Sequence, residues 1–188
     1  SIIDYWVQRY ALNNEYNAVQ EKHLLVAQNL TNALSRYSID VAAAFSALAD
    51  DPTIATGNQI QDILSTLHFK SIHRVNRGTG LSIQLFGINS NPPDVDEILD
   101  GTRTEDNYDR TIFGSLIFDK QEKPAIPLFR QIAHNEIMVG ELDPKYIIEL
   151  QQAISFGNRG HAAIVDHTGQ VIAHPNKDWQ MNKKNIGV

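Results

Sequence analysis

The stretch His161-Ala-Ala-Ile-Val-Asp-His-Thr-Gly-Gln-Val-Ile-Ala-His-Pro175 carries the clearest structural signal in this chain. It predicts a β-hairpin, because the turn-forming run from Asp166 to Gly169 separates two apolar segments. Gly169 can adopt a positive φ, and Pro175 ends the return strand because it has no N–H to donate. An isolated hairpin is marginally stable, so we expect it to form the last two strands of a larger sheet.

The chain before this hairpin predicts one long helix, then strands. Residues 2–49 contain no Gly or Pro, and apolar residues from Val19 to Leu48 recur at spacings of three and four. Asp50-Asp51-Pro52 ends this helix, and Asn58 is the expected N-cap of a short second helix over 58–67. Alternating and turn-bounded segments predict strands over 69–75, 81–87, 111–118, 125–132 and 136–141, followed by a helix over 145–154.

This order of elements indicates an α+β fold, with a central antiparallel sheet and flanking helices. We expect two parts: a long stalk or dimerisation helix over 1–50 and a single lobe over 51–188. A second apolar patch at Ile3, Trp6, Val7 and Tyr10 would be left exposed in a monomer. It favours pairing of two copies through the N-terminal helix.

Composition excludes several classes of function. The 22 acidic and 16 basic residues give a net charge of −6, which disfavours nucleic acid as a partner. The absence of Cys excludes disulfides, thiolate metal sites and a Cys nucleophile. No run of about 18 apolar residues predicts a membrane span. The sequence runs from Ser1 to Val188, and we expect membrane segments to flank it in the full protein.

The leading helix, the antiparallel sheet and the closing hairpin from Ile164 to Pro175 together resemble the Cache family of extracytoplasmic sensor domains. Gly140-Glu141-Leu142-Asp143 before a helix also resembles the last strand of the family's PAS-like sheet. The resemblance covers essentially the whole chain and is closest to the membrane-distal lobe of a double-Cache receptor. It implies a periplasmic or extracellular domain of a membrane-anchored histidine kinase, diguanylate cyclase or chemoreceptor.

In the family, a small ligand lies between the sheet and the loops over its face. One branch binds amino acids through an Arg-x-Trp-Tyr element and a late Asp. The element is absent between Gly101 and Phe118, and Glu141 occupies the position of the late Asp. A small polar ligand is therefore expected, with an amine, an amino acid and a carboxylate all open.

Two regions carry the expected ligand-binding residues. The first is the polar loop over 101–110 and the strand after it, because a loop of this length inside a compact domain is usually functional. Arginine supplies a fork for a carboxylate. The second region is the pair of strands over 125–132 and 136–141, because a charged residue inside a strand faces either water or a polar pocket. The expected residues are Tyr108, Arg110, Phe113, Ser115, Arg130 and Glu141, with Arg103 as a weaker candidate.

Several other candidates are better explained by structure than by chemistry. Asp166 is expected to shape its turn through an Asx-type bond. The seven histidines have no helical zinc spacing and are expected to be ordinary surface residues, with no metal. Ser115 lacks the second Gly of a Gly-x-Ser-x-Gly elbow, and Gly78-Thr79-Gly80 lies in a turn rather than before a helix. We therefore expect no enzyme activity and no cofactor.

Two other functions remain as alternatives. The chain can be a ligand-free module for dimerisation or protein interaction, in which case the lobe has a filled core. It can also be a cytosolic PAS domain with a buried cofactor, although no haem or flavin motif is present.

Overall fold

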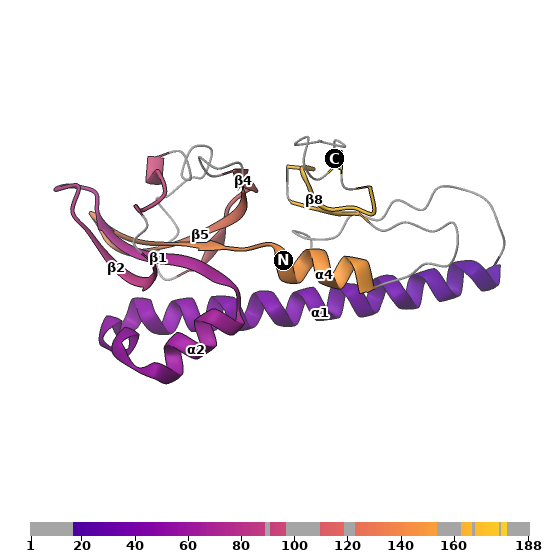
Figure 1. Ribbon diagram of the computed structural model, residues 1–188, viewed down its shortest axis with the longest axis horizontal. Helices are drawn as coiled ribbons and strands as arrows, with labels where there is room; N and C mark the ends of the chain where they lie inside the picture. Colours follow the sequence, from indigo (N-terminus) through magenta and orange to yellow (C-terminus); the bar gives the residue numbers. More distant parts are fainter. Residues whose placement is uncertain are drawn as a thin grey trace. The chain divides into compact units, whose positions relative to one another are not determined.

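The computed structural model describes residues 17–88, 91–96, 110–118, 123–153, 163–166, 168–176 and 178–179, with only the backbone over 17–23 (Figure 1). The α+β fold is confirmed. The elements are α1 (Asn17–Asp50), η2 (Pro52–Thr56), α2 (Asn58–Thr66), β1 (Phe69–Asn76), β2 (Ser82–Gly87), β3 (Ile112–Phe113), β4 (Ile117–Phe118), β5 (Pro124–Ala133), β6 (Glu136–Leu142), α4 (Lys145–Ala153), β7 (Ile164–Val165) and β8 (Val171–Ala173).

The chain forms two compact units. Ile39–Asp143 makes one, which we call the sheet unit, and Ser1–Ser38 with Pro144–Val188 makes the other, the hairpin unit. Helix α1 contributes its first part to the hairpin unit and its last turns to the sheet unit. The predicted functional division at residue 50 stays a prediction, whereas the compact units divide the chain within α1 and after Asp143.

Helix α1 forms where the apolar spacing predicts it. Its buried residues recur at spacings of three and four, which places them on one side of the helix. They are Leu30, Leu34, Tyr37, Val41, Phe45 and Leu48. The helix ends at Asp50 as expected, because Pro52 follows and Asp51 accepts hydrogen bonds from the backbone N–H and the hydroxyl of Thr53. The predicted helical residues 2–16 lie outside the described residues.

The sheet unit holds a six-stranded antiparallel sheet in the order β2-β1-β6-β5-β3, with β4 also paired to β5. In Figure 1 the end of α1 and helix α2 lie along one face of this sheet. Phe45 of α1 stacks on Phe69 of β1, with ring centroids 6.2 Å apart. Gly140 of β6 is the point of close approach, since a Cβ there would lie 2.9 Å from Phe45 Cε2.

Two local expectations are wrong. Gly57, not Asn58, is the N-cap of α2, and it makes no side-chain capping bond. The single strand predicted over 111–118 is divided into β3 and β4, whose registers on β5 differ by one residue. Pro127 on β5 has no N–H for a regular ladder, and its carbonyl accepts from Gly114 N at 2.7 Å. The chain opposite Pro127 therefore bulges by one residue.

The hairpin unit contains α4 and the pair β7–β8. Tyr146 of α4 packs on Tyr37 of α1, with ring centroids 4.5 Å apart. The hairpin forms as predicted, but β7 and β8 pair with each other in a separate two-stranded sheet. The expectation that they supply the last strands of the main sheet is wrong, because the chain leaves the sheet unit at Asp143. Among the described residues, no helix is long and apolar enough to cross a bilayer.

Candidate ligand-binding site

The strand register assigns each side chain of the central strands to one of two faces. Directly paired residues in an antiparallel sheet point to the same side, and neighbours along a strand alternate. We call the side that meets α1 the helix face and the opposite side the outer face. The outer face carries Ser71, His73 and Val75 of β1, Ile137, Val139 and Glu141 of β6, and Pro127 and Phe129 of β5.

The helix face is filled by packing and ion pairs. Arg130 is buried there and donates from Nη2 to Asp50 Oδ1 of α1 at 2.9 Å. Arg74 binds Glu136 through two hydrogen bonds, Nε to Oε1 at 3.0 Å and Nη2 to Oε2 at 2.8 Å. Phe113 is buried and pairs with Leu128, so it belongs to this face as well. Arg130 thus ties the sheet to α1, whereas Arg74 and Glu136 join β1 to β6.

One end of the outer face presents a buried polar group. Ser71 and His73 are each 1% exposed, although both are polar. Ser71 Oγ donates to Glu141 Oε2 at 2.9 Å across the β1–β6 ladder. The Glu141 carboxylate is half-buried. Burying a polar side chain costs free energy unless the group is hydrogen-bonded. Polar groups placed within an otherwise apolar sheet face are typical of a binding surface.

The middle of the outer face is apolar. Val75, Phe129, Ile137 and Val139 form one buried cluster, against which two more apolar side chains pack. Those two are Val95, in the turn after Pro92-Pro93, and Ile112 of β3. Segments on both sides of the region over 97–109 thus reach the outer face.

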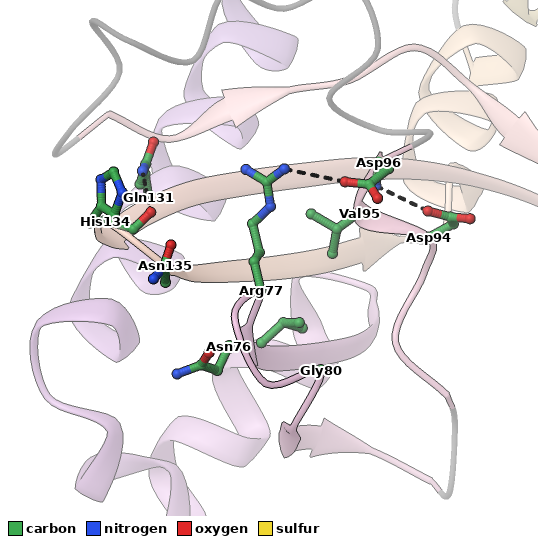
Figure 2. A pocket seen from close by; sticks show the side chains of 10 residues that line it. Asn76, Arg77, Gly80, Asp94, Val95, Asp96, Gln131, His134 and Asn135 are labelled. Carbon is green, nitrogen blue, oxygen red and sulfur yellow. Dashed lines mark hydrogen bonds and ion pairs between the residues drawn. The ribbon is translucent and has the colours of Figure 1, made fainter.

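The other end of the outer face opens into a pocket of about 690 Å³, which we call the rim pocket (Figure 2). Its walls are the β1–β2 turn with Arg77, the β5–β6 turn with His134 and Asn135, and the turn with Asp94 and Asp96. Figure 2 shows the Arg77 guanidinium in the middle of the pocket, directed toward Asp96. The Arg77 Nη2 to Asp96 Oδ1 distance is 3.3 Å.

The structure brings only some of the predicted site residues to the outer face. Glu141 lies there, whereas Arg130 and Phe113 lie on the helix face. Arg130 and Glu141, both expected at the ligand, therefore point to opposite faces of the sheet. Arg110 is exposed just before β3, and Ser115 is half-buried between β3 and β4. Tyr108 and Arg103 lie outside the described residues.

Sequence reasoning missed Ser71 and His73. His73 was expected at the surface with the other histidines, yet it is buried, because it pairs with Val139 of β6 and Gln84 of β2 in the interior of the sheet. No distinct sequence signal marked them, because polar residues of β1 fall on both faces, with Lys70, Arg74 and Asn76 beside Ser71 and His73. Within the described part of the chain, no group of three or more His, Cys, Asp or Glu side chains is arranged to hold a metal.

Comparisons with known proteins point to one fold. No protein-family model matches the chain, and the curated proteins give no match either. Among solved structures, the ligand-binding domain of Mlp24 with asparagine matches at 14% identity and a TM-score of 0.59, covering 88% of this chain and 74% of that one.

Two further structures match over similar lengths. The ligand-binding domain of the Campylobacter jejuni chemoreceptor Tlp3, in complex with 4-methylisoleucine, is 12% identical with a TM-score of 0.57, over 87% of this chain and 72% of that chain. The ligand-binding domain of the Pseudomonas aeruginosa PAO1 amino acid chemoreceptor PctB, in complex with L-Arg, is 17% identical with a TM-score of 0.55, over 89% and 76%. The chain therefore has the fold of the Cache-type ligand-binding domains of chemoreceptors.

Proposed function

We propose that this chain is the extracytoplasmic small-molecule-sensing domain of a transmembrane signalling receptor, and that it binds an amine-bearing ligand at Glu141. The observation that carries the proposal is the half-buried Glu141 carboxylate, held by Ser71 beside buried His73 on the outer face. The shared fold supports it, since the similar domains are ligand-binding domains of chemoreceptors.

The chemistry of the site favours an amine over a simple carboxylate. A half-buried carboxylate gains most from a cationic donor, because charge-assisted hydrogen bonds are about twice as strong as neutral ones. A carboxylate ligand placed beside Glu141 would instead be repelled. The structures compared above contain asparagine, 4-methylisoleucine and L-Arg, all of which are amino acids with an ammonium group. In an amino acid, the carboxylate would then be bound by Arg110, with Tyr108 and Ser115 as further candidates, whereas Phe113 lies on the helix face and is left out of the proposed site.

The ligand would act by favouring one arrangement of the receptor over another. A ligand shifts an equilibrium only through its different affinities for the two states. Ser46 of α1 and Thr111, next to Arg110, are hydrogen-bonded at 3.1 Å, which connects the stalk helix to the segment that leads into β3. We expect this bond and the Arg130–Asp50 ion pair to transmit ligand occupancy to α1. Pairing of two copies through the N-terminal helix and anchoring in the inner membrane belong to the same proposal.

A calorimetric screen tests the proposal. The purified chain is titrated with free amino acids, primary amines and small carboxylates at neutral pH. We expect saturable binding of at least one compound with an ammonium group. Glu141→Gln should weaken it by about tenfold or more, since a hydrogen bond to a charged group contributes about 1.5–3 kcal/mol. Glu149→Gln is the matched control, because Glu149 is an exposed residue of α4, and it should bind the ligand with unchanged affinity.

Two outcomes would overturn the proposal. If no compound binds to the folded chain, the ligand-free interaction module becomes the better reading. If Glu141→Gln binds the same ligand with unchanged affinity, the site lies elsewhere.

A further inference from the structure

The rim pocket has the form of a second binding site, separate from Glu141. Its volume of about 690 Å³ lies within the range of about 300–1,000 Å³ that is common for ligand pockets. The pocket begins at Val75, which lies four residues from Ser71 along β1. At ~3.3 Å per residue, the two positions are ~13 Å apart. The apolar cluster of Val75, Phe129, Ile137 and Val139 lies between the two ends of the outer face.

Arg77 supplies most of the pocket's unused hydrogen-bonding capacity. A guanidinium has five N–H donors. Among the described residues, the Arg77 side chain makes a single hydrogen bond, the 3.3 Å contact with Asp96. That pair is 42% and 86% exposed, so it contributes little and gives way easily to a better acceptor. The backbone of Arg77 is fixed meanwhile, since its N–H donates to Asn135 O at 2.8 Å.

The β5–β6 turn, next to Arg77, adds two polar groups to the lining of the pocket. No hydrogen bond to another described residue involves the His134 imidazole or the Asn135 side-chain amide, and both border the pocket. The neighbouring Gln131 amide is directed to the turn, since Nε2 donates to Ala133 O and His134 O at 3.3 and 3.4 Å. Donors from two turns thus converge on one space.

The acidic residues of the pocket are already engaged or hydrated. Asp94 Oδ1 accepts from the backbone N–H of Asp96 at 3.0 Å, which shapes their turn. The Asp96 side chain is 86% exposed and remains solvated. Val75 and Val95 are the apolar side chains in the lining. The pocket therefore offers a guanidinium fork together with a small apolar surface.

We infer that the rim pocket binds a small organic acid, whose carboxylate is held by Arg77 and Asn135 and whose short aliphatic part lies on Val75 and Val95. Arginine is suited to this task because its planar fork matches a carboxylate in two parallel hydrogen bonds. The inference stands independently of an amine site at Glu141.

Butyrate and butylammonium are the probes, because they share an aliphatic chain and differ in charge. Binding is followed on the intact chain by amide chemical shifts in two-dimensional NMR, with sodium chloride as the ionic-strength control. We expect saturable shifts with butyrate, centred on Arg77, His134 and Asn135. Arg77→Gln should weaken butyrate binding by at least tenfold. Arg36→Gln is the matched control, because Arg36 is an exposed residue of α1, and it should bind butyrate normally.

Asn135→Asp is the second variant, since it keeps the backbone carbonyl that receives Arg77 N–H but adds a negative charge beside the pocket. It should also weaken butyrate binding, whereas Glu141→Gln should leave it unchanged. Butyrate shifts centred on Ser71 and Glu141, equal binding by Arg77→Gln, or equal binding of butylammonium at the rim would each overturn the inference. Loss of the rim site alone, with Arg77→Gln binding butyrate equally, leaves amine binding at Glu141 untouched, and loss of amine binding in Glu141→Gln leaves the rim site untouched, so the two proposals fail separately.

Discussion

Asp166 and Arg74 each hold local structure through several hydrogen bonds. Asp166 is buried and its Oδ1 accepts from Thr168 N, Thr168 Oγ1 and Gln170 N, which confirms the Asx-type turn expected from the sequence. Arg74 and Glu136 likewise form a two-bond pair between β1 and β6. The hydrogen bonds from Arg74 are the main cause that lowers the pKa of Glu136 below its ordinary value.

The Arg74–Glu136 pair predicts a specific dependence of stability on pH. Because the pKa of Glu136 is lower in the folded chain, the pair stabilises the fold above the unfolded value near pH 4.5 and loses this effect as pH falls through the folded pKa. The free energies of unfolding of the unmodified chain and Glu136→Gln, measured by urea titration, should therefore differ by about 1 kcal/mol at pH 6, as for a partly exposed pair. They should converge toward pH 3. A difference that stays constant from pH 6 to pH 3 would contradict the prediction.

Among the elements, α1 and the sheet make the decisive contact of the sheet unit. Phe45 fits against Gly140, and Arg130 and Ser46 bond across the same interface. Gly140 is required here by space and not by backbone conformation. Its neighbours Phe45 and Leu128 leave room for a hydrogen but not for a methyl group.

Gly140→Ala should destabilise the sheet unit by about 1–3 kcal/mol, since overpacking forces the helix and sheet apart. Urea unfolding followed by circular dichroism measures the loss. Phe45→Leu shortens the side chain that the new methyl group meets, so the double variant should lose less than the sum of the two single changes. Strict additivity of the two free-energy changes would show that the contact is not the cause.

At the scale of the whole molecule, α1 is the element shared by both units, and it leaves apolar side chains uncovered. Leu24, Leu25 and Ile39 are 44%, 58% and 56% exposed. Leu25 and Ile39 are two heptads apart, which places them on the same side of a helix that pairs in a coiled coil. This supports the proposed pairing through the stalk helix.

Ile39→Lys should shift the chain from dimer to monomer, because a charge at a paired helix face must be desolvated. Sedimentation velocity over a concentration series measures the shift. Ile63→Lys on α2 is the matched control, since Ile63 is 49% exposed and lies outside α1. A monomeric unmodified chain, or equal behaviour of the two variants, would contradict pairing through α1.

The sequence by itself determined the local elements of this protein. The end of α1 at Asp50, the turn after Asn76, helix α4 and the hairpin around Asp166 all depend on residues close together in the chain. Helical periodicity, Pro and Gly positions and Asx turns report such local preferences directly. The family resemblance also pointed to Glu141, at the position of the late Asp, as a ligand-binding residue, and this role stays a prediction.

Only the tertiary structure decided which residues share a face and which sheet each strand joins. The side-chain period of a strand is two, so a shift of one residue in register moves a side chain to the other face. Arg130 and Phe113 were therefore expected at the ligand and lie on the helix face, while buried His73 went unrecognised. The closing hairpin was predicted correctly as a hairpin, but its separation from the main sheet depends on long-range pairing that no local pattern encodes.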